Sequence, residues 1–488
     1  MKNYIYLIAV ALLMVGCSSE NEPSTLNPQS SALNYINLAI SVNGGVNFSS
    51  RAVPAGGEDG DGREAGFTRE NNISGITLIL YQGTGVNAAA STAIDFVAYY
   101  PVSRVAKDAD SRIEATYETG NCLVPHNTID FTKTYHAIVV ANANLTSSLA
   151  AGSSTLGDVR DMTVAQIYRG DETKSAQQCE AFVMASEQDN TLNFSASGVM
   201  SRDAAGDYIY NLTSQPLVIE RLAARIDFWA AKATYSDGTT YGNHPGYVYN
   251  VTGSLTDKFV VTGVMPFNLT YNNATYGNEY LLKRLTESFS TVTPVWLATE
   301  TTTNHVLDPL TTSKLTATTP ALVNALGDVK DLPSFAANGY FKSVAAMHAA
   351  LGAGTTAGYS SLTDAAMTGE DVIVAYPMEN TLIPGESLLY YHATGVAVEG
   401  YYYTGGLSGT AQRYVYYGYL RHQGEGTSYD ILTTNSTTEM SSSTAMNFAV
   451  VRNNIYRVWI NGVDEKGSIE LAIKVKKWDP FTHSVIYM

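Results

Sequence analysis

The sequence predicts a mainly β protein made of two antiparallel β-sandwich domains with a few short helices. Its 488 residues exceed what one hydrophobic core usually holds, so two domains are expected. With 33 Tyr and 40 Gly but only 15% charged residues, the composition favours half-buried strands over surface helices. Short strand-like runs separated by Gly, Ser and Asn turns, without a short repeat period, favour sandwiches over a solenoid or a propeller.

The charge balance excludes several classes of partner. The chain carries 29 Lys and Arg residues against 45 Asp and Glu residues, a formal net charge of −16. No basic tract interrupts this acidic background. Nucleic acids and anionic membrane surfaces are therefore not expected as partners.

The N-terminus has the pattern of an export signal. Lys2 precedes an apolar run at 4–15 that is too short to span a bilayer as a stable helix. The run ends at Gly16 and Cys17, which resembles a bacterial lipobox, where the cysteine is lipidated and becomes the new N-terminus. We therefore predict a lipoprotein signal peptide at 1–16 and lipidation, such as palmitate attachment, at Cys17. An ordinary secretory signal with a chance cysteine is the alternative.

Two further cysteines, Cys122 and Cys179, lie in a chain that crosses an oxidising compartment. Their positions in the sequence do not say whether their Cα atoms come within bonding range. A disulfide and two buried free thiols are both open. Neither cysteine has a CxxC or CxxH partner, so no metal site is expected.

The first domain begins with a strand defined by alternating apolar residues. Residues 33–42 place four of them on one face: Ile36, Leu38, Ile40 and Val42. The loop that follows, up to residue 72, is polar and glycine-rich and holds Arg51, Arg63 and Arg69. A helix is expected where acidic residues open the run 156–168. Further strands are expected at 73–81, 92–100, 134–140, 193–200 and 216–229, and we place a domain boundary near residue 215.

The second domain has the same pattern of short strand-like runs separated by turns. A helix is expected at 343–351, because glycine stops that alanine-rich run. Strands are expected at 371–376, 387–393, 414–420, 455–461 and 468–476. The last run alternates clearly, with four apolar side chains on one face: Ile469, Leu471, Ile473 and Val475.

No motif for catalysis or for a cofactor stands out. The eight histidines are scattered and none lies in HExxH. The run GLSG at 406–409 has its second glycine one position early for a nucleophile elbow, and the acidic run 58–62 lacks calcium-loop spacing. Seven tyrosines at 401–419 could stack on sugars, but alternating tyrosines also cover the face of a sheet, which we favour. We predict no enzyme, no cofactor and no metal.

Several motifs, taken in their order along the chain, resemble the FimA-type fimbrillins, the major subunits of type V pili, and especially the short-fimbria major-subunit branch. The similarity covers nearly the whole chain. It rests on Cys17, Arg51-Ala52 behind the first strand, ISGITLILY at 73–81, YHAIVVANAN at 135–144, ERLAARI at 220–226, YPMENT at 376–381, VRNNIYR at 451–457 and IKVKKW at 473–478.

The resemblance implies two transthyretin-like sandwich domains, at 52–215 and 216–488, in an outer-membrane lipoprotein precursor. It implies that a trypsin-like protease cuts between Arg51 and Ala52, with Arg63 and Arg69 as secondary sites. The cut removes the lipid tether and the first strand, at 17–51, and a C-terminal donor strand of another copy then fills the groove. The donor candidates are Ile469, Leu471, Ile473 and Val475.

The implied mature protein is a subunit of cell-surface fimbriae that supports adhesion and biofilm formation. Its expected partners are further copies of itself, accessory fimbrial subunits and surface ligands of host or bacterial cells. A monomeric, lipid-anchored glycan-binding protein is the alternative, since it would share the export signal, the β content and the tyrosines. A surface hydrolase would need a convergent acid–base pair, which the sequence does not offer.

Overall fold

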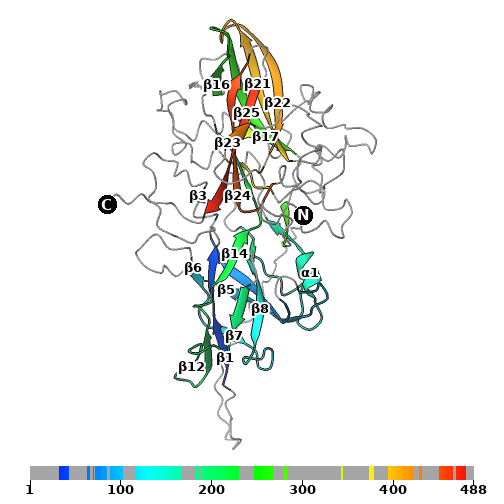
Figure 1. Ribbon diagram of the computed structural model, residues 1–488, viewed down its shortest axis with the longest axis vertical. Coiled ribbons are helices and arrows are strands. Elements are labelled where there is room, and N and C mark those ends of the chain that lie inside the picture. Colours follow the sequence, from blue (N-terminus) through cyan, green and yellow to red (C-terminus); the bar gives the residue numbers. More distant parts are fainter. Residues whose placement is uncertain are drawn as a thin grey trace, which may run out of the picture.

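The computed structural model describes residues 32–42, 63–65, 70, 72–84, 88–102, 116–166, 182–186, 190–229, 247–267, 278–282, 342–343, 373–377, 394–420, 422, 428–430, 450–464 and 469–479. The mainly β prediction is confirmed: strands dominate these residues, and α1 (Leu156–Arg160) is the helix among them. The strands of the two halves of the chain lie towards opposite ends of the long axis in Figure 1.

Two sheets build the N-terminal half. The smaller has the order β12-β13-β1-β7, with β1 at Asn34–Asn37, β7 at Cys122–Val124, β12 at Met200–Arg202 and β13 at Tyr208–Asn211. The larger has the order β5-β4-β8-β10-β14-β2-β6, with β11 beside β8. Its strands are β2 Ala39–Val42, β4 Gly75–Tyr81, β5 Ile94–Pro101, β6 Thr116–Glu118, β8 Thr134–Ala141, β10 Met184–Ser186, β11 Asn190–Asn193 and β14 Leu217–Arg221.

Two more sheets build the C-terminal half. One has the order β20-β15-β24-β25-β23, with β3 also beside β25. Its strands are β3 Arg63–Ala65, β15 Arg225–Trp229, β20 Ile373–Ala375, β23 Ser428–Asp430, β24 Asn454–Val463 and β25 Ile469–Asp479. The other has the order β16-β17-β21-β22, with β19 beside β17. Its strands are β16 Tyr247–Asn250, β17 Lys258–Phe267, β19 Lys342–Ser343, β21 Gly395–Thr404 and β22 Thr410–Tyr419, while β9 Thr163–Gln166 and β18 Asn278–Leu281 form a separate pair.

A central segment, which we call the spine and which covers residues 208–229, connects the two halves. It runs through β13, β14 and β15 and pairs in parallel first with β1, then with β2 and finally with β24. The three sheets that contain the spine are therefore mixed, because strands from both sides of the spine in the sequence lie beside it through long connections. The sheet with the order β16-β17-β21-β22 is antiparallel throughout. The change from one sheet to the next falls between β14 and β15, slightly beyond the predicted boundary at 215.

Most predicted strands appear with small shifts of their ends. The run at 33–42 divides into β1 and β2 around Leu38, and the runs at 455–461 and 468–476 become β24 and β25. The strand predicted at 193–200 is wrong, because turns separate β11 from β12 there. The predicted helix at 156–168 ends at Arg160, since the β-branched residues that follow form β9 against β18. The runs at 344–351 and 387–393 lie outside the described residues.

A hydrophobic core lies between the sheets of each half. In the N-terminal core the fully buried residues include Ile36, Leu38, Ile40 and Val42 of the first strand. The C-terminal core includes residues from β15, β17, β21, β24 and β25. The first strand is thus part of the core of its own domain and not an appendage to it.

We predict that shortening one buried side chain of the first strand destabilises the protein strongly. Leu38 is 0% exposed, whereas Leu123 is 48% exposed on β7. Leu38→Ala should lower the free energy of unfolding by about 2–5 kcal/mol, through lost burial and a residual cavity. The same change at Leu123 should cost about 1 kcal/mol or less. Urea denaturation of both variants measures the difference, and equal losses would contradict the packing described for Leu38.

Candidate functional site

The first strand is the candidate site, because it takes part in both sheets of the N-terminal half. Its first part, β1, lies between β13 and β7, and its second part, β2, lies between β14 and β6. The two parts are joined at Leu38, whose carbonyl oxygen accepts a hydrogen bond from the Thr119 N–H at 3.1 Å. Removal of this strand would open a continuous trench through both sheets and leave backbone groups unpaired on each side.

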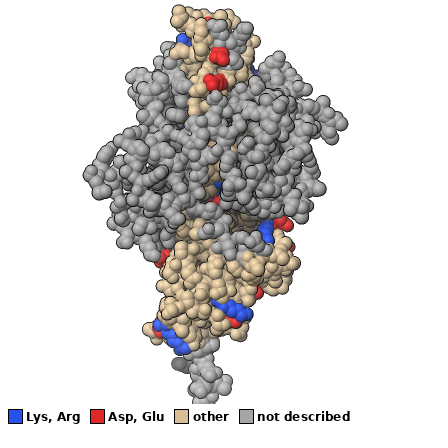
Figure 2. Space-filling view, in the orientation of Figure 1, with Lys and Arg blue, Asp and Glu red and all other residues tan. Residues whose placement is uncertain are grey.

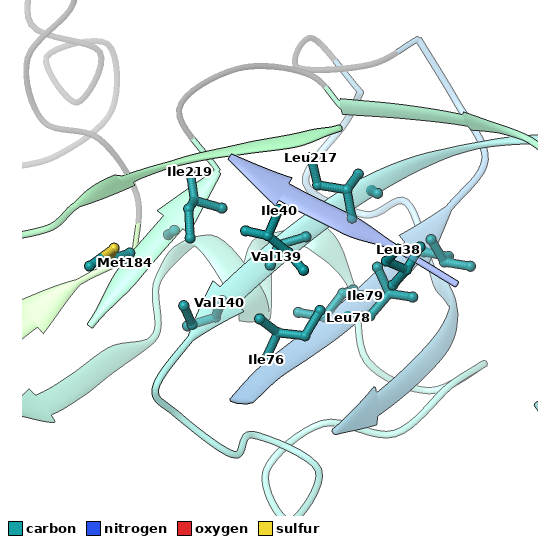
Figure 3. Packing of buried hydrophobic residues seen from close by; sticks show 14 of the residues in the cluster. Leu38, Ile40, Ile76, Leu78, Ile79, Val139, Val140, Met184, Leu217 and Ile219 are labelled. Carbon is teal, nitrogen blue, oxygen red and sulfur yellow. The ribbon is translucent and has the colours of Figure 1, made fainter. Parts of the chain in front are cut away.

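The inward face of the strand is fully apolar and fully buried. Ile36, Leu38, Ile40 and Val42 are each 0% exposed. Figure 3 shows Leu38 and Ile40 among the side chains of the neighbouring strands. Four such side chains are worth roughly 6–12 kcal/mol at about 1.5–3 kcal/mol each, an upper bound because unfolded chains are already partly collapsed. An emptied trench would therefore be a strongly apolar acceptor for a replacement strand.

Cys122 lies directly beside the first strand. It pairs with Ile36 across the antiparallel contact between β7 and β1, and it is 4% exposed. It is a free thiol, and burial raises its pKa above the ordinary value. Cys179 lies outside the described residues, so the free thiol is described for Cys122 alone.

The predicted donor residues lie in β25, within the C-terminal core. Leu471, Ile473 and Val475 are 0% exposed and Ile469 is 5% exposed. One edge of β25 pairs with β24, and the opposite edge pairs with β23 and β3. To act as a donor, β25 would have to leave this sheet.

The two strands have closely similar sequences. Residues 36–42 read INLAISV and residues 469–475 read IELAIKV, so they differ only at Asn37 against Glu470 and at Ser41 against Lys474. The apolar residues Ile, Leu, Ile and Val occupy the same alternate positions in both, and in both they are buried. A trench shaped by the first strand would therefore accept β25 in one register without a change in the volume of any of these side chains.

Most residues of the predicted processing region are not described. Cys17, Arg51, Ala52 and Arg69 lie outside the described residues. Arg63 begins β3, which pairs in parallel with the last part of β25. The structure thus connects the chain behind the predicted processing loop to the predicted donor strand.

A buried cluster of charged and polar residues joins the end of that loop to both halves. We call it the arginine network. Its members are 0–2% exposed apart from Asn453, at 3%, and they are Glu70, Glu220, Arg221, Arg225, Asp227, Tyr376, Arg452, Asn453 and Arg457. Burying ions is costly unless charges and hydrogen bonds compensate them, and this network provides both.

Asp227 is at the centre of the arginine network. Its carboxylate accepts two parallel hydrogen bonds from Arg225, at 2.9 and 2.8 Å, and a third from Arg457 at 3.3 Å. This fork-on-fork geometry is among the strongest that side chains form. Because Arg225 and Asp227 lie on β15 and Arg457 lies on β24, the contact fixes the parallel register of these strands.

Glu70 attaches the chain behind the predicted processing loop to the same network. Its carboxylate accepts a hydrogen bond from Tyr376 and one from Arg225, the latter at 3.3 Å. Its backbone carbonyl accepts a hydrogen bond from Arg221 at 3.1 Å, and Arg221 also donates to Asn453 at 2.8 Å. Residue 70 is therefore fastened through both its side chain and its main chain.

The sequence motifs include several residues of this network, but the sequence did not indicate that they form a network. The motifs at 220–226 and 451–457 supply its four arginines and the motif at 376–381 supplies Tyr376, but Glu70 and Asp227 were not singled out. Asn453 has a positive φ of 59°, and so does Asn142 at 61°, a conformation that asparagine tolerates better than most residues. Asn142 donates to Asn72 O at 2.8 Å and accepts from Ser74 N at 2.9 Å.

The other predicted features give no second site. Tyr403 and Tyr419 are 3% and 1% exposed, and Tyr402, Tyr414 and Tyr416 pack against the C-terminal core. Among the described residues, no group of His, Cys, Asp and Glu could hold a metal ion. No helix within the described ranges is long and apolar enough to cross a membrane. Figure 2 shows scattered Lys, Arg, Asp and Glu on the described surface of this face, without a patch of one sign.

Comparisons with known proteins found similarity to solved structures at low sequence identity. No protein-family model and no curated protein matches the chain. A putative cell adhesion protein from Parabacteroides distasonis is 14% identical, with a TM-score of 0.42, over 92% of this chain and 98% of that chain. A fimbrilin from Porphyromonas gingivalis is 12% identical, with a TM-score of 0.38, over 93% and 99%. The C-terminally truncated tip fimbrial protein Mfa3 from the same species is 10% identical, with a TM-score of 0.35, over 91% and 100%.

We predict that the arginine network is essential for stability. Asp227→Asn keeps the shape of the side chain but removes the charge that Arg225 and Arg457 face, so it should cost about 3–5 kcal/mol. Lys133→Ala breaks an ion pair with Asp130 at 3.7 Å whose side chains are 50% and 47% exposed, and it should cost about 0–1 kcal/mol. Urea denaturation compares the two variants. A loss below 1 kcal/mol in Asp227→Asn would show that the network does not hold the fold.

Proposed function

We propose that this protein is a structural subunit of a cell-surface fimbria, exported as an outer-membrane lipoprotein through Cys17. A trypsin-like protease cuts it after Arg51, and copies then polymerise by strand replacement. The observation that carries the proposal is the position of the first strand, which fills a slot in both N-terminal sheets and is followed by an arginine-containing loop. Accessory fimbrial subunits and surface ligands are further expected partners.

The burial of the first strand in its trench supports replacement by another strand over spontaneous loss of the first strand. Because the strand buries four side chains completely, cutting the loop alone does not remove the free energy that holds it. An incoming strand gains the same main-chain hydrogen bonds and fills the same side-chain positions. We infer that the incoming strand displaces the first strand from one end to the other, as the two exchange hydrogen bonds.

The sequence match between residues 36–42 and 469–475 supports β25 of a second copy as the incoming strand. Each copy then offers one slot and one donor, and a head-to-tail contact that does not close produces a filament. The donor leaves its own sheet in the process, so burial lost in one subunit is regained in the next. This near balance explains how a strand with a fully buried face can change subunits.

We predict that purified fibres begin at Ala52. The first strand would then be absent, because the cut behind Arg51 separates it from the rest of the chain. N-terminal sequencing of fibres checks this. Arg51→Ala alone should slow processing, and replacement of Arg51, Arg63 and Arg69 together should hold the protein as a lipid-anchored monomer that begins at Cys17. Arg202→Ala removes an exposed arginine from β12 and should leave fibres normal. Fibres that begin at Cys17 would refute the mechanism and would favour a protein that keeps its first strand, such as a monomeric glycan-binding protein.

We also predict that Ile469→Cys crosslinks to Cys122 of a second copy. In the proposed register Ile469 takes the place of Ile36, whose backbone pairs with Cys122, and paired residues of antiparallel strands have Cα atoms at about 4.5–5.5 Å, within the disulfide range. In a Cys179→Ser background, oxidised fibres should give a ladder of covalent oligomers on non-reducing gels. The thiolate is the reactive form of cysteine, and burial raises the pKa of the Cys122 thiol. The oxidation should therefore be carried out at about pH 9.

Two matched variants control the crosslinking experiment. Glu470→Cys faces the opposite side of the strand from Ile469 and should give no ladder. Ile36→Cys should bond to Cys122 within one chain, lock the first strand in its slot and block polymerisation until a reductant is added. A ladder with Glu470→Cys, or free polymerisation of the oxidised Ile36→Cys variant, would contradict the proposed register.

A further inference from the structure

The described residues at 63–65, 70, 72 and 74 are held by contacts, although they follow a glycine-rich stretch of sequence. Residues 63–65 form β3 against β25, and Glu70 is 0% exposed in the arginine network. Asn72 and Ser74 are held by the side chain of Asn142. The backbone is therefore held at both ends of the stretch that contains the Arg63–Glu64 and Arg69–Glu70 bonds.

A protease must draw several residues on both sides of the cut bond into an extended form in its active site, and it therefore cuts most readily at exposed loop tips. In the Arg69–Glu70 bond, Glu70 is the residue on the C-terminal side of the cut. Freeing it would break the hydrogen bonds from Tyr376, Arg225 and Arg221 and expose a cluster of buried charges. For the Arg63–Glu64 bond, the pairing of β3 with Lys477 and Trp478 would have to open.

From this geometry we infer that Glu70 and β3 form a stop for arginine-specific proteolysis, so that residues 63–70 stay in the mature subunit. This deepens the proposed function and rests on it for the identity of the processing protease. It also removes Arg63 and Arg69 from the secondary processing sites. Before polymerisation, the retained segment keeps the new N-terminal arm attached beside β25, the predicted donor.

Limited digestion of the purified full-length precursor with trypsin tests the inference. New N-termini are labelled isotopically and quantified at each bond, in the native protein and in urea. The comparison with urea removes the intrinsic preference of trypsin for the residues around each bond. We expect the Arg63–Glu64 and Arg69–Glu70 bonds to be cut at least about 100-fold more slowly in the native protein, because cleavage then follows the population of the opened form.

Substitutions at Glu70 and Tyr376 test the inference more specifically. Glu70→Ala should speed native cleavage at Arg69 by at least about tenfold, and Tyr376→Phe, which removes one hydroxyl from the contact, should have a smaller effect. Glu470→Ala, an exposed glutamate on β25, should change neither bond. The buried Arg221–Leu222 bond reports global unfolding, and it should remain uncut in all these variants.

The outcomes separate the inference from the proposed function. Native cleavage at Arg69 as fast as in urea, or no acceleration in Glu70→Ala with Arg221–Leu222 intact, would overturn the stop and leave strand replacement untouched. If Glu70→Ala also allows cleavage at Arg221–Leu222, that variant unfolds globally and the result for Tyr376→Phe is used instead. Unchanged protection of the Arg69–Glu70 bond in Tyr376→Phe would then count against the role of Glu70. Fibres that begin at Cys17 would overturn the proposed function while a protected segment at 63–70 still stood.

Discussion

The contact of Asp227 with Arg225 and Arg457 is the constraint on which the remaining structure depends. It sets the register between the spine and β24, and β24 in turn sets the register of β25. Through Arg225 the same contact reaches Glu70, which fixes where the chain behind the loop rejoins the fold. A buried ionic cluster is a costly way to hold a fold, but its geometry tolerates few alternatives, and this suits a junction where several distant segments meet.

The molecule combines this fixed junction with two strands for which we propose an exchange. The first strand and β25 fill different sheets, yet their buried faces have the same apolar residues in the same order. Neither strand contributes an arginine or a carboxylate to the network. Exchange of these strands therefore costs mainly apolar burial, which a similar sequence restores, and leaves the ionic contacts in place.

Much of the fold was predictable from alternation of apolar residues, and the exceptions have physical causes. Strand β25 carries a clear pattern with a period of two, and β4 and β8 are runs rich in β-branched and other apolar residues. Strands β6 and β7 are three residues long and are defined by their partners. The parallel pairing of the spine follows from long-range contacts that no local pattern encodes. Asp227 looks like the solvent-facing residue of a strand in the run RIDFW, and only the arrival of Arg457 from the far end of the chain explains its burial.

The spine has a mechanical consequence. It runs alongside β1, β2 and β24 in turn, with its strand direction parallel to theirs. When tension is applied along these strands, the hydrogen bonds between them are loaded in shear and must break together. A strand peeled from its end would instead lose them one at a time under a much smaller force. Pulling along the strands that flank the spine therefore loads the hydrogen bonds of each parallel pair together.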